Sequence, residues 1–111
     1  MTIEDIRPRT LHMLKLREQY VRPIIECKMR YQIRLNDRGY QAGDIIKFTV
    51  VGINGEPIDL NELDEKQGYC TKNEVQLLEG REYRVDFVTN MEGLEAGFVV
   101  FSISDNKKKS L

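Results

Sequence analysis

Polar and apolar residues alternate without exception over residues 30–35. Successive side chains of a strand point to opposite faces, so Arg30, Gln32 and Arg34 share one face and the apolar residues share the other. The pattern predicts a half-buried strand. Its apolar face, which includes Tyr31, packs on a core, and its open side carries a basic row.

Turn-forming residues follow this strand directly. Asn36, Asp37 and Gly39 accept the backbone geometry of tight turns, and a Gly-Asp pair gives a second turn before the apolar run 45–51. Cationic side chains and turn backbone are therefore expected beside one another.

The remaining residues predict further strands and one main helix. Apolar residues at helical spacing over 17–27 indicate an amphipathic helix. Because proline is tolerated only in a first turn, Pro23 implies either that the helix starts near Val21 or that it is kinked. Alternating or β-branched runs predict further strands at 10–16, 44–53, 74–78, 82–89 and 98–104. In the strand at 82–89 we expect one face to carry Tyr83, Val85, Phe87 and Thr89.

The segment between the strands at 44–53 and 74–78 carries a turn and an acidic loop. Asn54-Gly55 is a strong hairpin signal because both residues tolerate positive φ, but Pro57 and the acidic segment 59–68 interrupt the partner strand. We interpret 59–68 as an exposed loop with one helical turn capped by Asp59 or Asn61.

Length and composition limit the fold to a single small domain. The 111 residues are 41% hydrophobic and 32% charged, which is typical of a globular chain and not of a disordered one. We expect a flexible lead-in over 1–9, one domain over 10–104 and a disordered basic tail over 105–111. Five or six strands with one main helix predict a small, mostly β (α+β) barrel with an outer helix.

The net charge of −1 conceals an asymmetry along the chain. Residues 1–38 carry nine Lys or Arg against five Asp or Glu, whereas residues 39–111 carry eight against thirteen. A basic N-terminal third fits a specific anionic ligand, whereas non-specific nucleic-acid binding favours a uniformly basic chain.

Two cysteines and one histidine give no metal-ligand pattern. Cys27 and Cys70 lie far apart and have no usual spacing with His12, so we expect two reduced thiols in a cytoplasmic protein, without metal or cofactor. No apolar run approaches the ~20 residues that cross a bilayer, and no signal segment opens the chain, so we expect no membrane partner.

A longer pattern around the basic row resembles a known family. The tail of the pattern reads Arg34, Asn36-Asp37-Arg38 and Gly43-Asp44. It resembles the ASCH superfamily of small PUA-like β-barrels, in particular the short bacterial and phage branch, in which Gly-x-Lys-x-x-Glu-x-Arg precedes these residues. The Gly, Lys and Glu positions hold Cys27, Met29 and Gln32 here. The resemblance extends over most of the chain through Leu14-Lys15, Gly80-Arg81 and residues 93–100.

The basic row provides the candidate binding residues. A planar guanidinium pairs with two phosphate oxygens at once and stacks on bases, so arginines beside turn backbone suit RNA or a nucleotide. We expect a cleft lined by Arg30, Gln32, Arg34 and Arg38 and closed by Lys15 or Arg81. We expect Asp37 to orient an arginine or cap the turn, and Tyr40 to stack on a base.

Two other functions fit the sequence. Superfamily members that resemble amidohydrolases acting on modified nucleosides, such as acetylated cytidine, use the Lys of the pattern. Met29 cannot act as nucleophile or base and Gln32 has no titratable proton, so catalysis here depends on the adjacent Lys28. The third hypothesis is a bacterial or phage accessory domain that binds another protein. We expect a binding protein rather than an enzyme.

Overall fold

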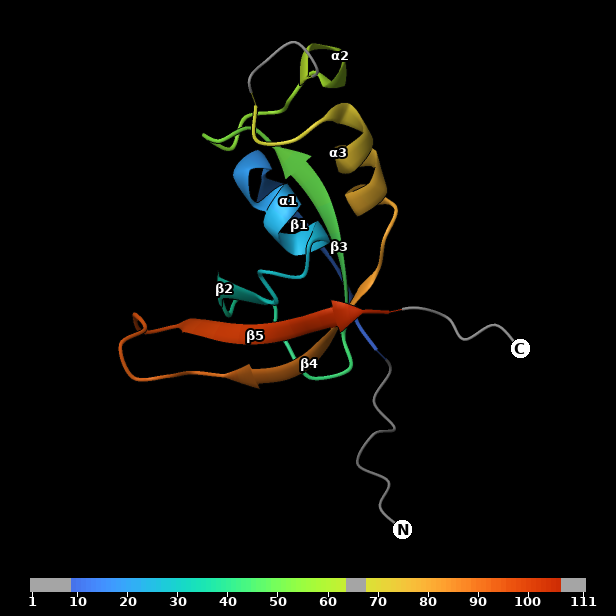
Figure 1. The fold of residues 1–111 in the computed structure, drawn as a ribbon. Helices are drawn as coiled ribbons and strands as arrows, with labels where there is room; N and C mark the ends of the chain where they lie inside the picture. The colour runs from blue at the N-terminus through green and yellow to red at the C-terminus, as the bar shows by residue number, and fades with distance from the viewer. Residues whose placement is uncertain (1–8, 64–67, 107–111) are drawn as a thin grey trace, which may run out of the picture.

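Five strands form one curled sheet in the order β1-β3-β4-β5-β2, and short helices pack along it (Figure 1). In the computed structural model, which describes residues 9–63 and 68–106, the strands are β1 (Leu11–Arg17), β2 (Tyr31–Leu35), β3 (Ile45–Val51), β4 (Tyr83–Thr89) and β5 (Phe98–Asp105). The prediction of a small, mostly β fold is confirmed, and the sheet is a half-barrel with β1 and β2 as its edges. Most of the predicted lead-in and tail lies outside the described residues.

The core lies on the inner face of the sheet. β1 and β3 pair in parallel, whereas the other neighbouring strands are antiparallel. Alternate residues are buried along both strands of the parallel pair, so Leu14 and Leu16 share one core cluster with Phe48 and Val50. This alternation is what a sheet with one covered face requires.

β2 turns its apolar face outward, contrary to the prediction. Tyr31, Ile33 and Leu35 are 48%, 50% and 49% exposed, whereas Gln32 is only 3% exposed and Arg34 is half-buried. β2 is an edge strand, and its inner face borders a cleft. Polar residues can occupy the inner face of β2 because the cleft beside that face is open to polar partners.

A β-bulge in β4 changes which residues face the core. The strand register shifts between Val85 and Phe87, which makes Asp86 the extra residue. Val85 is fully buried, but Phe87 is 63% exposed and Val88 packs against the core. The residues predicted to share one face of this strand are therefore divided between the core and the outer surface.

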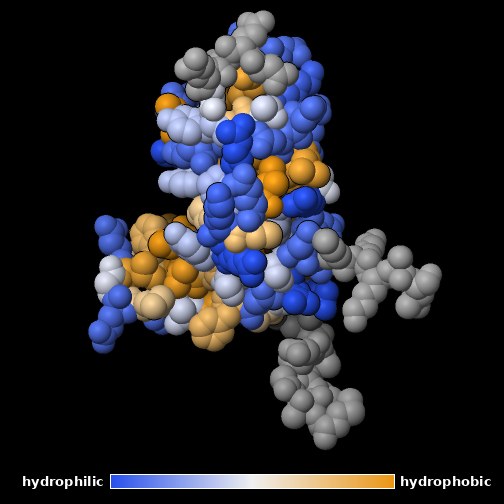
Figure 2. Space-filling view, viewed as in Figure 1, coloured by the Kyte–Doolittle hydropathy of each residue, from blue (hydrophilic) through white to orange (hydrophobic). Residues whose placement is uncertain are grey.

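The outer faces of β2, β5 and β4 together form an apolar surface. Figure 2 shows hydrophobic side chains gathered at the end of the molecule where these strands lie. The strand register assigns to it Tyr31, Ile33, Leu35, Phe98, Val100 and Phe87. This outer apolar surface is a consequence of the inverted β2 and of the bulge in β4.

Residues predicted as a strand at 74–78 form helix α3 (Lys72–Glu79) instead. The Thr71 hydroxyl accepts a hydrogen bond from the Glu74 N–H at 3.2 Å, and the Glu74 carboxylate accepts one from the Thr71 N–H at 2.8 Å. This capping box starts the helix, and Val75 and Leu78 then turn toward the core.

Helix α3 takes the place of β4 beside the upper part of β3. β3 pairs with β4 only at Ile45 and Ile46, so its later residues need other partners. The Val50 N–H donates to the Glu79 carboxylate of α3 at 2.8 Å.

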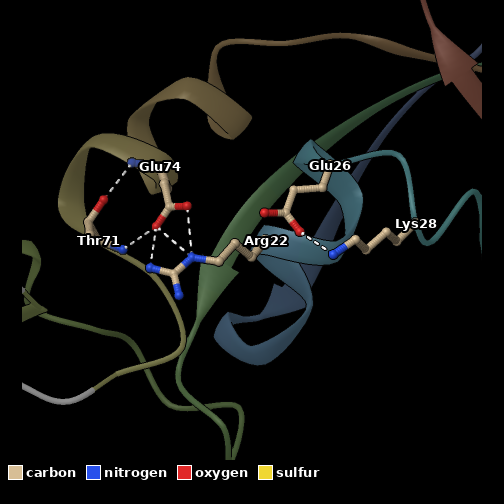
Figure 3. A network of polar contacts seen from close by, with 5 residues as sticks. All are labelled: Arg22, Glu26, Lys28, Thr71 and Glu74. Carbon is tan, nitrogen blue, oxygen red and sulfur yellow. Dashed lines mark hydrogen bonds and ion pairs between the residues drawn. The ribbon is translucent and has the colours of Figure 1, made fainter.

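The predicted first helix is present but short. A 3₁₀ turn (Glu18–Tyr20) leads into α1 (Val21–Ile25), which starts where Pro23 indicated. The Arg22 guanidinium donates three hydrogen bonds of 2.9 to 3.2 Å to the Glu74 carboxylate, which joins α1 to α3 (Figure 3).

The segment after β3 forms the predicted turns but no hairpin. Gly55 has a φ of 88°, and the Gly52 N–H donates to the Glu56 carbonyl at 2.7 Å. The helical turn α2 (Leu60–Leu63) follows, and Asp59 caps it by accepting from the Asn61 N–H at 2.9 Å. No helix in residues 9–63 and 68–106 is long and apolar enough to cross a membrane.

A buried hydrogen bond between His12 and Asp44 fixes the start of β1 to the start of β3. His12 and Asp44 are 4% and 0% exposed, and Nε2 of the imidazole lies 2.9 Å from Oδ2 of the carboxylate. Asp44 also accepts from the N–H groups of Gln41 at 3.0 Å and Thr10 at 3.4 Å. The carboxylate therefore holds together two segments that are distant in sequence.

Candidate functional site

A cleft lies between the two edge strands, where the half-barrel is not closed by strand pairing. It consists of two adjoining hollows of about 390 and 410 Å³, which share Lys15 of β1 and Arg34 of β2. The first hollow is lined by Lys15, Leu16, Arg17, Tyr20, Met29, Tyr31, Gln32, Ile33 and Arg34. The second is lined by Met13, Leu14, Lys15, Arg34, Leu35, Asp37, Arg38 and Tyr40. We call the two hollows together the arginine cleft.

Arg34 spans the cleft. Its Nε and Nη2 donate to Oε1 of Gln32 at 3.2 and 2.8 Å, and Nη2 also donates to the backbone carbonyl of Lys15 at 2.9 Å. The buried Gln32 amide is held in turn by its own donation to the Tyr31 carbonyl at 3.1 Å. The guanidinium is therefore held in a fixed orientation between β2 and β1.

Only neutral groups accept hydrogen bonds from Arg34. No carboxylate of the described residues forms an ion pair with it, so its positive charge is not neutralised. Burial lowers the pKa of Arg34, with the nearby Arg38 acting in the same direction and Tyr40 against it. A partly desolvated cation without a counter-ion favours an anion beside it.

Arg38 extends the positive region into the second hollow. Its Nη1 lies 3.4 Å from the Met13 carbonyl of β1, and the side chain is exposed. Asp37 lines the same hollow but forms no hydrogen bond or ion pair with a described residue, so it does not orient an arginine. Asn36 supports the turn instead, because its Oδ1 accepts from the Tyr40 N–H at 3.1 Å.

Tyr40 is a core residue rather than a stacking platform. It is 5% exposed, and its ring lies 4.8 Å from the His12 ring and 4.7 Å from the Phe101 ring. Burial raises the pKa of Tyr40, while Arg34 and Arg38 oppose that shift. The expected stacking on a base is contradicted because both neighbouring rings already contact it.

Two exposed tyrosines at the first hollow were missed by the sequence reasoning. Tyr20 and Tyr31 are 41% and 48% exposed and line the hollow together with Arg17. Tyr31 was expected in the core because it alternates with polar residues. The signal for the exposure of Tyr31 is its position on an edge strand. An aromatic ring with a polar tip is well suited to an open surface there.

Arg30 and Arg81 do not line the arginine cleft. Arg30 donates from Nε to the Cys27 carbonyl at 3.1 Å. Both arginines line a separate pocket of about 370 Å³ between the end of α1 and the end of β5. The expectation that they share a site with Arg34 is therefore wrong, whereas Lys15 does form the opposite wall.

Lys28 also lies outside the arginine cleft. Its side chain is 75% exposed, and Nζ pairs with the Glu26 carboxylate at 3.1 Å (Figure 3). The neighbouring Met29 lines the first hollow. A lysine at 28 therefore does not replace the lysine that the family pattern has one residue later.

The described residues do not suggest a metal centre. No group of three or more His, Cys, Asp or Glu side chains in 9–63 and 68–106 has a geometry that holds a metal ion. The candidate site is therefore defined by cationic, amide and aromatic side chains.

Comparisons with known proteins do not extend this description. No protein-family model matches the chain, and a search of curated proteins gives no match either.

Proposed function

We propose that the arginine cleft binds RNA or a nucleotide-like anion. The observation that carries this proposal is the uncompensated charge of Arg34, which lies half-buried between two hollows and contacts only neutral acceptors. Lys15, Arg17 and Arg38 add positive charge around it, against the single carboxylate of Asp37. Phosphate oxygens are the natural partners of such a cluster.

Exposed aromatic rings support a nucleotide over a simple anion. Tyr20 and Tyr31 border the hollow that contains Arg34, and stacking of one base on an aromatic ring contributes about 1–3 kcal/mol. The volumes of about 390 and 410 Å³ are within the range of small-ligand sites. A nucleotide with its base at Tyr20 and its phosphate at Arg34 fits this distribution.

The resemblance to the ASCH superfamily supports the same function. Cys27, at the glycine position of the family pattern, has a φ of 60°, a conformation in which glycine is favoured. Gln32, at the glutamate position, leaves Arg34 charged where a carboxylate would neutralise it. These departures favour anion binding and remove the groups that amide hydrolysis needs.

The other two hypotheses have different support. No observation favours the amidohydrolase, because Lys28 points to Glu26 and lies outside the cleft. The outer apolar surface is the feature that bears on a protein-interaction domain, which stays a prediction. If the protein is such an interaction domain, neither nucleic acid nor a nucleoside shifts its melting temperature.

The test is a titration of fluorescently labelled single-stranded RNA at several salt concentrations. Arg34→Ala with Arg38→Ala is expected to weaken binding and to reduce the slope of log affinity against log salt by about 1.4, since each phosphate contact contributes ~0.7. Lys28→Ala with Arg84→Ala is the matched control, because it removes two positive charges outside the cleft. Equal affinity of the cleft variant and the control variant would disprove the proposal.

A further inference from the structure

A second pocket lies between the end of α1 and the end of β5, and we call it the α1–β5 pocket. Its volume is about 370 Å³, and Arg34, Arg38 and Lys15 do not line it. Only Met29 borders both this pocket and the arginine cleft. The α1–β5 pocket is therefore a separate candidate for ligand binding.

Two buried hydroxyl groups in the lining have no hydrogen-bond partner among the described residues. These are Oη of Tyr83, a residue that is 5% exposed, and Oγ of Ser104. Buried polar atoms of native proteins are nearly always hydrogen-bonded, so such an unpaired pair indicates a partner from outside the chain. The register places the two side chains on opposite faces of the sheet, because Tyr83 pairs with Asp105 whereas Ser104 pairs with the exposed Arg84. A single ligand group therefore reaches only one of the two hydroxyls, and the donor on the covered face is that of Tyr83.

The rest of the lining defines the chemistry of that partner. Ile24, Met29 and Ile103 supply an apolar wall, and a space of this volume holds a small organic molecule. Water alone satisfies the hydroxyls but gains nothing from the apolar wall. The pocket therefore favours a molecule with an apolar body and a polar end.

Charges in the lining select the polar end. Arg81 lies beside the Tyr83 hydroxyl without hydrogen-bonding geometry, and it forms no ion pair within the described part of the chain. Burial raises the pKa of Tyr83, so the phenol stays protonated near neutral pH and acts as a donor. A guanidinium and a hydroxyl match the two acceptor oxygens of a carboxylate. Arg30, Asp86 and Asp105 also line the pocket, and Asp86 is already paired with Arg84. The charges that remain, two guanidinium groups against one carboxylate, accommodate one negative charge on the ligand rather than two.

We propose that the α1–β5 pocket binds a small monocarboxylic acid with an apolar or aromatic body. The ligand carboxylate accepts a hydrogen bond from Tyr83 and pairs with Arg81. Its body lies against Ile24, Met29 and Ile103. This site is independent of RNA or nucleotide binding in the arginine cleft.

Cys27 provides a built-in reporter of occupancy. Its exposed thiol lines the pocket, whereas Cys70 is buried and burial raises the pKa of the Cys70 thiol to about 11. Alkylation by iodoacetamide therefore reports on Cys27, because the thiolate is the reactive species. A bound ligand is expected to slow this reaction.

The experiment titrates isotope-labelled protein with 3-phenylpropanoate and with the uncharged 3-phenylpropanol, followed by amide chemical shifts. The acid is expected to shift residues around 81–86 and 102–105, to slow alkylation of Cys27, and to bind more tightly than the alcohol. Tyr83→Phe and Arg81→Gln are each expected to weaken binding of the acid by about tenfold. Arg38→Ala, in the arginine cleft, serves as the control with unchanged affinity.

The outcomes separate the proposal from a merely hydrated pocket. The absence of shifts at millimolar acid, or equal affinity for acid and alcohol, overturns it. So does unchanged affinity in Tyr83→Phe, a variant that keeps the ring and removes only an unpaired hydroxyl. Arg81→Gln repeats this test at the other group that contacts the carboxylate if the phenylalanine variant does not fold.

Discussion

Arg34 donates a hydrogen bond from Nη2 to the backbone carbonyl of Lys15 at 2.9 Å, and this contact connects the two edge strands of the sheet. A strand edge leaves N–H and C=O groups unpaired, and a side chain satisfies one of them here. The same guanidinium carries the charge that we assign to ligand binding. Arg34 therefore contributes both to the structure of the half-barrel and to its proposed function.

Replacing Gln32 with Glu is expected to neutralise Arg34 without removing it. The new carboxylate would accept the same two hydrogen bonds from Arg34 and form an ion pair with it. We expect RNA affinity to fall by about tenfold or more, equivalent to ~1.4 kcal/mol, with the fold retained. Fluorescence anisotropy measures the affinity, and circular dichroism checks the fold.

Gln32→Met is the control for that change. It also removes the amide but leaves Arg34 charged, so its affinity should stay well above that of Gln32→Glu. Equal loss in both variants would show that the amide, rather than the charge on Arg34, controls binding.

Replacing Asp44 with Ala is expected to destabilise the fold strongly. The carboxylate is fully buried and accepts from His12, Gln41 and Thr10, so its removal leaves buried donors unpaired. We expect the free energy of unfolding to fall by about 3 kcal/mol or more. Urea denaturation measures it. Asp37→Ala, at an exposed carboxylate without hydrogen bonds to described residues, should change it by less than ~0.5 kcal/mol.

The link between α1 and α3 is expected to depend on pH. Hydrogen bonding from Arg22 lowers the pKa of Glu74, with further lowering by Thr71 and opposition from burial. A carboxylate with a lowered pKa stabilises the fold above its unfolded pKa of about 4.3, and that contribution is lost as pH falls through the folded pKa. Glu74→Gln keeps the capping box but removes the charge.

Urea denaturation of both proteins at several pH values measures this effect. The native protein should be more stable than Glu74→Gln near pH 7, and the difference should shrink toward about pH 3. A difference that stays constant over this range contradicts a role for the charge.

Replacing Cys27 with Gly is expected to stabilise the protein. Cys27 has a φ of 60° and ends α1, and its exposed side chain loses little burial when removed. A non-glycine residue is strained in the left-handed region, so we expect a gain of about 0.5–1 kcal/mol in the free energy of unfolding. Thermal or urea denaturation measures it. Cys27→Ala keeps the strain and should show no such gain, which separates backbone relief from loss of the thiol.

The sequence predicted the strands better than their orientation. Alternation showed correctly which residues of 31–35 share a face, although Arg30 lies before β2 and lines another pocket. Period-two patterns do not say which face is inside. Tyr31 faces outward because it pairs with Ser102, whereas Gln32 pairs with the core residue Phe101, and this register is set by β5, far along the chain. The helix α3 was detectable from Thr71 and Glu74, whose spacing is that of a capping box.

The candidate site was predictable in part. Lys15, Gln32, Arg34 and Arg38 do come together at one cleft, as the basic row indicated. Arg81 could not be placed from local patterns, because the turn before β4 sets its position relative to α1. Contacts across the half-barrel depend on the curl of the sheet, which no short stretch of sequence encodes.

The extra residue at Asp86 gives β4 two different roles along its length. Its first half supplies Val85 to the core, and its second half supplies Phe87 to the outer apolar surface. Deleting Asp86 would leave Val85 and Phe87 as successive residues on opposite faces, still across from Ile103 and Ser102, whereas adding a residue within 87–89 would reverse the faces beyond it. Protein engineers who lengthen the β4–β5 hairpin should therefore add residues beyond Thr89, where the tip can change without altering that assignment.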